Sequence, residues 1–199
     1  NDTWVKTGQD IDGEASGDGS GSSVSLSADG SVVAIGADYN NGNGSSSGHV
    51  RVYTLVNDTW VQTGQDINGE ASGDGSGDSV SLSADGLVVA IGAWKNNGNG
   101  ADSGHVRIYG LVNGTWVQTD QDINGEAAQD FSGDSVSLSA DGTVVAIGAF
   151  KNDSGGTDSG HVRVYESSLS TDSDGDGLSD FKELYNYGTE TNNIDTDGD

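Results

Sequence analysis

The sequence predicts an all-β fold made of three tandem four-stranded antiparallel units, followed by a short acidic tail. Trp4, Trp60 and Trp116 stand 56 residues apart, and the chain around them repeats with the same period. The three units are residues 1–56, 57–112 and 113–168. The first and second differ at 10 of 56 positions, and the second and third at 15, so all three must share one structure. Apolar clusters alternate with Gly, Ser, Asn and Asp stretches, and no helical periodicity occurs before residue 170, which is typical of short strands.

The second unit shows the expected strands most clearly. Four strands are expected, at 59–63, 78–84, 87–93 and 104–109, with Gly-rich loops at 64–77 and 94–103. Apolar and polar residues alternate in 78–84 and again in 104–109, so each of these strands has one buried face. The segment 87–93 is apolar on both faces, which predicts a fully buried inner strand. Asp85 and Gly86 tolerate the positive φ of a tight turn and are expected to join the two middle strands.

Composition excludes several classes of function. The chain has 199 residues, with 32 Asp and Glu against 7 Lys and Arg, and a net charge of −25. Such a surface would repel nucleic acid, so we expect no nucleic-acid partner. No apolar run reaches the length needed to cross a bilayer, and we expect no membrane insertion. The absence of Cys excludes disulfides, thiolate zinc sites and thiol nucleophiles.

The repeat resembles a known surface-protein motif. The run SGDSVSLSADGLVVAIGA followed by NNGNGADSGHVRIY is similar to the FG-GAP-type repeat of many bacterial surface proteins and, more distantly, of integrin α-chain propellers. The resemblance covers residues 1–168 and implies that one repeat forms about one propeller blade. Integrin-type repeats bind calcium at acid-rich turns, whereas residues 83–86 carry the single acid Asp85. Calcium at these turns is therefore not implied.

Three units leave the higher architecture open. A closed propeller needs about four to eight blades. The units are therefore part of a larger propeller, in which two chains could complete six blades, or an open array, or a self-closed β-trefoil. The open array would expose sheet edges that seek neighbours, and the expected partners are further copies of the chain or neighbouring repeats of the same protein, with a glycan or a surface protein as the alternative.

The tail after the repeats predicts a calcium site. Residues 171–183 read TDSDGDGLSDFKE, in which acids fall at positions 1, 3, 5, 9 and 12 of a twelve-residue loop with Gly at position 6. Ca²⁺ prefers six to eight oxygen ligands, which alternate residues of a tight turn can supply. The expected ligands are Asp172, Asp174, Asp176, the Leu178 carbonyl, Asp180 and Glu183. Asp195, Asp197 and Asp199 begin a second, truncated loop, where we expect weak binding or none.

The loop pattern also resembles a family of calcium repeats. The sequence DxDxDGLSDxxE is similar to the thrombospondin type-3-like repeat, which forms calcium-filled spacers in bacterial proteins. Residues 180–187 are expected to leave the loop as a short helix. The alternative for the tail is an acidic segment without fixed structure, but random acids would rarely match this spacing.

Other repeated residues allow a structural and a functional interpretation. His49, His105 and His161 could gather round an axis and bind zinc, but a hydrogen-bonding role beside strand residues is the favoured interpretation. The repeated Arg residues are expected to pair with acids of the repeats. The repeated Trp residues are expected to pack between units, with sugar stacking as the alternative, and Trp94 is expected to be exposed.

The sequence favours a non-catalytic role. We expect a calcium-binding structural or adhesion module of a larger secreted bacterial protein, located outside the cell or on its surface. The alternatives are a lectin-like module with one sugar site per repeat and a non-catalytic domain of a secreted enzyme. No nucleophile–base pattern stands out, so no catalytic residue is assigned.

Overall fold

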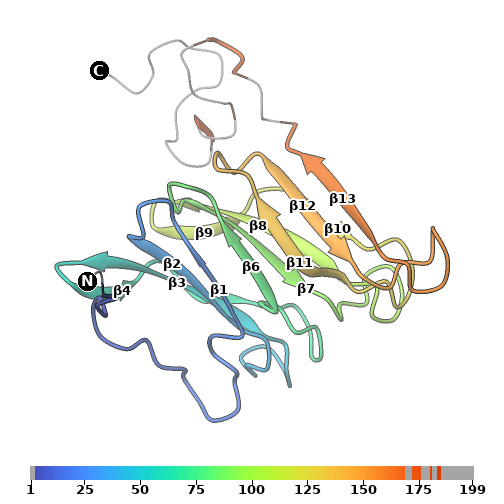
Figure 1. Ribbon diagram of the computed structural model, residues 1–199, viewed down its shortest axis with the longest axis horizontal. Helices are drawn as coiled ribbons and strands as arrows, with labels where there is room; N and C mark the ends of the chain where they lie inside the picture. Colours follow the sequence, from blue (N-terminus) through green and yellow to red (C-terminus); the bar gives the residue numbers. More distant parts are fainter. Residues whose placement is uncertain (1–2, 169–171, 176–179, 181–182, 185–199) are drawn as a thin grey trace.

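Three antiparallel sheets form the body of the protein, as the sequence predicts (Figure 1). The computed structural model describes residues 3–168, 172–175, 180 and 183–184. We call the three sheets blades 1, 2 and 3, in chain order. They lie in a row with their faces packed together, and the first strands of the blades, β1, β6 and β11, are neighbours.

Blade 1 contains five strand segments: β1 (Ser23–Leu26), β2 (Val32–Ala37), β3 (His49–Val56), β4 (Thr59–Gln62) and β5 (Ile67–Asn68). The order is β1-β2-β3-β4, and the short β5 pairs with the other end of β3. Together, β4 and β5 therefore make one interrupted outer strand.

Blade 2 repeats this arrangement with β6 (Ser79–Leu82), β7 (Val88–Ala93), β8 (His105–Val112), β9 (Thr115–Gln118) and β10 (Ile123–Asn124). Every residue of β7 is buried, which confirms the expected inner strand. The expected strands all occur, and their observed ends differ from the expected ones by only a few residues.

Blade 3 contains three strands: β11 (Ser132–Leu138), β12 (Val144–Ala149) and β13 (His161–Glu166). A bulge interrupts the β11–β12 register between Ser132 and Ser135. Among the described residues, blade 3 has no counterpart of β4 or β9. The repeat stops at this point of the sequence: Glu166, Ser167 and Ser168 replace the last three residues of the β8 equivalent, and the acidic segment 171–174 stands at the positions of β9.

The blades are offset from the sequence units. The strand Thr59–Gln62 opens the second unit but pairs with β3, at the end of the first. A two-residue turn at Asn57 and Asp58 makes this hairpin possible, with φ of 48° and 60° at the two residues. Each complete blade thus takes its outer strand from the next unit.

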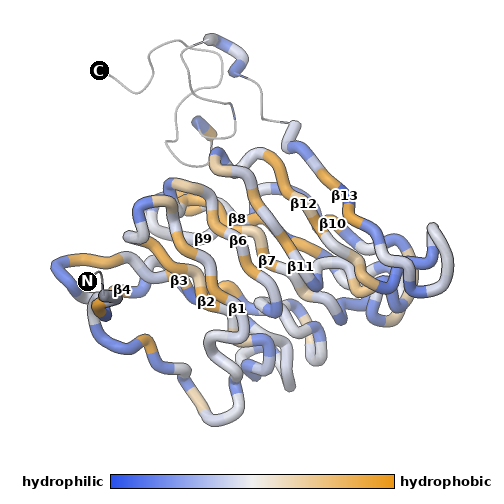
Figure 2. The backbone as a smooth tube through the Cα atoms, in the orientation of Figure 1, coloured by the Kyte–Doolittle hydropathy of each residue, from blue (hydrophilic) through white to orange (hydrophobic). Residues whose placement is uncertain are grey.

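The core lies between the blades. One cluster joins Val50 and Val52 of blade 1 to Leu82, Val89 and Ile91 of blade 2. A second cluster joins the corresponding faces of blades 2 and 3. Figure 2 shows hydrophobic residues along the strands and mostly polar residues in the loops. Each blade is thus stabilised mainly by its neighbours.

The sheets remain separate from one another. Among the described residues, only the isolated bridges Gly48–Ser76 and Gly104–Ser132 connect neighbouring blades by strand-type pairing. A self-closed trefoil would join strands of all three units in one closed barrel, and the three separate sheets contradict that alternative. The described blades form an open row, with both end faces uncovered.

The turns at Asp29, Asp85 and Asp141 have a structural role. The Asp85 carboxylate accepts hydrogen bonds from the Ser83 hydroxyl (2.6 Å) and the Leu87 amide (3.0 Å). At the equivalent Asp29, hydrogen bonds from the amide and hydroxyl of Ser31 lower the pKa to about 2, with a further contribution from Ser27. These carboxylates therefore brace the turns.

Candidate functional site

The described part of the acidic tail forms a compact turn. The Asp172 carboxylate accepts a hydrogen bond from the Gly175 amide at 2.7 Å. Asp180 accepts two hydrogen bonds from Ser173, one from its amide (2.8 Å) and one from its hydroxyl (2.7 Å). Positions 2 and 9 of the predicted loop are therefore tied together, and Asp180 braces the loop.

The later carboxylates of this loop are buried. Asp180 is 7% exposed and Glu183 is fully buried. A carboxylate removed from water needs a compensating positive charge or several donors, so burial at position 12 fits a cation ligand. Asp174, at position 3, is half-buried on the same turn. Among the described residues, the groups of three ligand atoms within 4.8 Å of one another do not include these four carboxylates, so the calcium loop stays a prediction from spacing and burial.

The remaining predicted ligands lie outside the described residues. These are Asp176, Leu178, Asp195, Asp197 and Asp199. Of the expected helix at 180–187, the described residues Asp180, Glu183 and Leu184 are helical.

A second group of charged residues occurs once per blade. In blade 2, the Arg107 guanidinium donates to both oxygens of Asp122, at 2.7 and 2.9 Å. The Nη2 of Arg107, which donates to Asp122, also forms an ion pair with Glu70. The buried Nδ1 of His105 faces the same two acids, 3.8 Å from Asp122 and 3.9 Å from Glu70, and makes no hydrogen bond.

The arrangement shifts the pKa of both His105 and Asp122. Burial lowers the pKa of His105, and the positive charge of Arg107 lowers it further, so the ring is neutral at pH 7. Hydrogen bonds from Arg107 lower the pKa of Asp122. The cluster therefore contains one cation, two carboxylates and a neutral imidazole.

The other blades contain versions of this cluster. Arg51 pairs with Glu14, and Arg163 pairs with Glu126. The prediction that each repeated Arg pairs with an acid of the repeat is therefore confirmed. His49 also has a lowered pKa, again mainly because it is buried.

Two of the clusters contain the atoms of a metal site. Ligand atoms of Glu70, His105 and Asp122 all lie within 4.8 Å of one another, as do those of Glu14, His49 and Asp66. These groups could hold a metal ion, but in blade 2 the guanidinium of Arg107 already occupies both carboxylates. No such group among the described residues combines two His, so the three-imidazole zinc site is not formed. A bracing ion-pair network explains the geometry without a metal.

The repeated Trp residues differ sharply in environment. Trp116 is 3% exposed, and its indole Nε1 donates to the carbonyl of Thr63 at 2.8 Å. Trp60 makes the same contact with Thr7 at 3.1 Å and is half-buried. Trp4 is fully exposed. Trp116 therefore packs between blades, and it presents no free ring face for a sugar.

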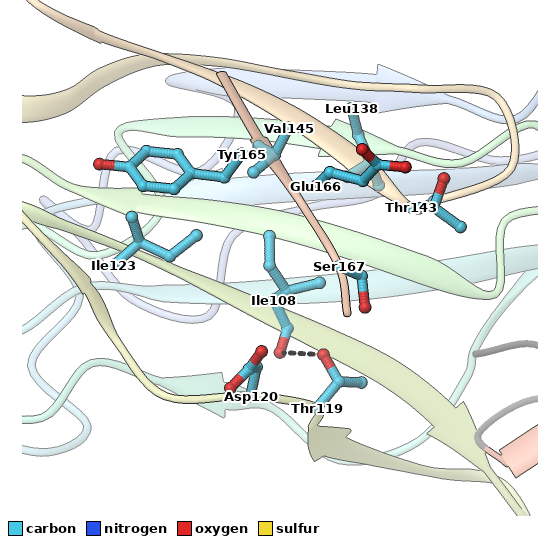
Figure 3. Close-up of a pocket in the computed structure, with 11 residues that line it drawn as sticks. Ile108, Thr119, Asp120, Ile123, Leu138, Thr143, Val145, Tyr165, Glu166 and Ser167 are labelled. Carbon is cyan, nitrogen blue, oxygen red and sulfur yellow. Dashed lines mark hydrogen bonds between the residues drawn. The ribbon is translucent and has the colours of Figure 1, made fainter. Parts of the chain in front are cut away.

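A pocket of about 140 Å³ lies where blade 3 lacks an outer strand (Figure 3). Ile108, Ile123, Leu138, Val145 and Tyr165 form its apolar wall. The residues 56 positions earlier surround Trp116 in the core between blades 1 and 2. The pocket therefore corresponds to the space that Trp116 fills between blades 1 and 2. At the repeat position equivalent to Trp116, the sequence has Asp172.

Sequence reasoning missed an aromatic cluster at one end of the strands. Phe131 stacks on Phe150 with 5.5 Å between ring centroids, and Trp94 lies 5.2 Å from Phe131. The Lys95 ammonium lies 4.2 Å from the centre of the Trp94 ring. Trp94 is half-buried, so its expected exposure was only partly right. The signal was available, because Trp94 and Phe150 stand where the first unit has Asp38, and Phe131 stands where the other units have Gly19 and Gly75.

Comparisons with known proteins give little beyond overall shape. No protein-family description and no curated protein matches the chain. Similar solved structures include hydrazine synthase of Kuenenia stuttgartiensis, with 10% identity over 82% of this chain and 36% of that one, at a TM-score of 0.47. Another is the periplasmic gluconolactonase PpgL of Pseudomonas aeruginosa, with 17% identity over 73% of this chain and 39% of that one, also at 0.47.

These likenesses carry no functional argument. The chain spans less than two fifths of either protein, and both identities are very low. The resemblances to FG-GAP and thrombospondin type-3-like repeats remain predictions, because no family matches. Over the described residues, no helix has the length and apolar character that crossing a bilayer would need.

Proposed function

We propose that the chain is a calcium-binding structural module of a protein that acts outside the cell, in adhesion or surface assembly. The observation that carries this proposal is the burial of Glu183, together with Asp180, in a loop whose acids have calcium-ligand spacing. Asp172, Asp174 and Glu183 would supply ligand oxygens from the described residues, and Asp180 would hold the loop closed through Ser173. Bound Ca²⁺ would add positive charge next to these closely spaced carboxylates.

The location is proposed from the chemistry of the site. Extracellular calcium modules have dissociation constants of about 10⁻⁴–10⁻³ M, far above cytosolic calcium concentrations. A strongly acidic surface keeps a protein soluble in such surroundings. We propose a structural rather than catalytic role, because His49 and His105 belong to bracing ion-pair clusters. The lectin-like alternative loses support from the burial of Trp116.

Calcium titration of single-site variants tests the proposal. We expect Glu183→Gln and Asp174→Asn to weaken calcium binding at least tenfold in calorimetry, because each removes a charged ligand. Asp58→Asn is the matched control, since Asp58 is exposed in the repeat region and is expected to bind as the unchanged chain does. Circular dichroism should show that the strands of 3–168 persist in all three variants. Unchanged affinity in both loop variants would refute the calcium assignment.

A further inference from the structure

The two ends of the row of blades expose complementary apolar faces. Inside the row, Val50 and Val52 of blade 1 are fully buried against blade 2, and Val106 is fully buried against blade 3. The equivalent residues of blade 3, Val162 and Val164, are 69% and 66% exposed.

The opposite face of blade 1 is exposed in the same way. Val24 is 65% exposed and Leu26 is 59% exposed. Their equivalents in blade 2 are the half-buried Val80 and the buried Leu82, which pack on blade 1. The exposed face of blade 1 is therefore equivalent to the blade 2 face that packs on blade 1. The exposed face of blade 3 is equivalent to the face of blade 1 on which blade 2 packs.

Hydrogen bonds between blades repeat with the same period. The Ser23 hydroxyl donates to the Gly77 carbonyl, and the Ser79 hydroxyl donates to the Gly133 carbonyl, both at 2.6 Å. Blade 3 keeps the donor as Ser135, and blade 1 keeps the acceptor as Gly21.

Two further pairs follow the same rule. The Leu82 amide donates to the Ser25 hydroxyl (2.9 Å), and the Ala84 amide donates to the Ala140 carbonyl (2.8 Å). The equivalent groups at the two ends are the Ser137 hydroxyl and Ala140 amide of blade 3, and the Leu26 amide and Ala28 carbonyl of blade 1. Each end thus retains the polar groups of an internal junction.

A groove on blade 3 matches a turn of blade 1. The groove has a volume of about 400 Å³, and its lining includes Gly148, Phe150, Gly160, His161 and Val162. At the internal junctions, backbone fills the equivalent space, where Gly48 bridges to Ser76 and Gly104 bridges to Ser132.

Glycine is required at these junctions by close approach. A Cβ at Gly36 would overlap the Gly77 carbonyl, and a Cβ at Gly92 would overlap the Gly133 carbonyl. At Gly148, the closest group to such a Cβ is the hydroxyl of Ser135, which can rotate away. Gly148 therefore keeps open a space that blade 3 itself does not need.

We propose that the blade 1 face of a second copy of this chain docks on the blade 3 face, with its Ser20–Gly21 turn in the groove at Gly148. This interface continues the internal blade-to-blade packing by one more step. It joins two different patches, so each added copy leaves the same two ends free, and association closes as a ring or grows as a chain. The inference names the partner for the proposed assembly role, and it does not depend on the calcium loop.

The exposed Trp4 strand is not part of this interface. Trp60 and Trp116 lie directly over Gly8 and Gly64, where a Cβ would be 2.7 Å from the indole. The third repeat has Asp120 at the position of Gly8 and Gly64, so the space that a Trp ring would need over this residue is not kept free. The proposed docking therefore uses the flat faces of the blades and involves no exchange of the Trp4 strand between copies.

Sedimentation velocity of the full chain over a range of concentrations tests the proposal. The unchanged chain should sediment above the mass of one chain, increasingly so with concentration and with added salt that screens the net charge of −25. Val164→Asp on blade 3 and Leu26→Asp on blade 1 should each raise the dissociation constant at least tenfold. The matched control is Val61→Asp, because Val61 is 48% exposed on the outer strand β4 and should associate normally.

Mixing the variants distinguishes the proposed geometry from a two-fold contact. Val164→Asp keeps its blade 1 face and Leu26→Asp keeps its blade 3 face, so the mixture should give one-to-one dimers and nothing larger. Gly148→Ala provides a second block that changes no charge, and its circular dichroism should match the unchanged chain. A chain that remains monomeric at every concentration overturns the proposal, as does a mixture that stays monomeric, or a control that associates as poorly as the face variants.

Discussion

At the scale of single residues, Asp78 is the clearest electrostatic weakness of the fold. It lies at the junction of the blades, where burial, followed by the charges of Asp38 and Asp134, raises its pKa to about 6. The folded chain therefore binds a proton that the unfolded chain releases near pH 4. Stability is expected to fall as the pH rises from about 4 through 6, because Asp78 must then ionise inside the fold.

Replacing Asp78 by Asn should remove this penalty. We expect Asp78→Asn to be more stable than the unchanged chain at pH 8, by about 1 kcal/mol once solvent screening is allowed for, and nearly equal to it at pH 4. Ser22 occupies the same position in the first unit, so the site accepts a neutral side chain. Urea unfolding at the two pH values measures the difference. A variant that is less stable at pH 8 would mean that the Asp78 charge is stabilised, for example by a bound cation.

At the scale of elements, the outer strand β9 is anchored by Trp116. Its ring is buried in the core between blades 1 and 2, and Gln65 exchanges hydrogen bonds with its backbone at 2.7 and 3.0 Å. Trp116→Ala should destabilise the protein by about 3–5 kcal/mol, as loss of a buried aromatic residue generally does. Trp4→Ala, at the fully exposed equivalent, should change stability by less than about 0.5 kcal/mol. Guanidinium unfolding compares the two, and equal losses would contradict the packing role.

The strands were predictable because alternation and turns are local signals. The blade boundary was missed, although the signal was present: Asn57–Asp58 and Asn113–Gly114 stand between apolar strands, and all four residues have positive φ. Such a pair is typical of a two-residue hairpin, which places the Trp strand on the preceding blade. The short β5 and β10 carry no pattern of their own, because two residues in a Gly-rich loop depend on their partner strand.

The candidate sites were predictable to different extents. The calcium loop rests on spacing within twelve residues, so the sequence alone suggested it. The pairing of Arg107 with an acid was expected, but its partners Glu70 and Asp122 come from distant parts of the chain and only the fold brings them together. The aromatic cluster at Phe131 depends in the same way on contact between blades.

At the scale of the whole molecule, stability is expected to differ from blade to blade. Each blade is stabilised mainly by contact with its neighbours, as in other repeat proteins. Blade 2 is covered on both faces, and all of β7 is buried. Blades 1 and 3 each have one uncovered face, at Val24 and Val162 respectively. Opening should therefore start at the ends of the row and reach the centre last.

Amide hydrogen exchange followed by mass spectrometry can measure this gradient. In dilute solution we expect the slowest exchange in β7 and faster exchange in β1 and β13, since local opening there exposes less apolar surface. If copies dock end to end, protection of β1 and β13 should rise with protein concentration, while the outer strand β4 stays unchanged. Equal protection of all three blades in dilute solution would contradict the nearest-neighbour account, because stability would then not depend on which faces are covered.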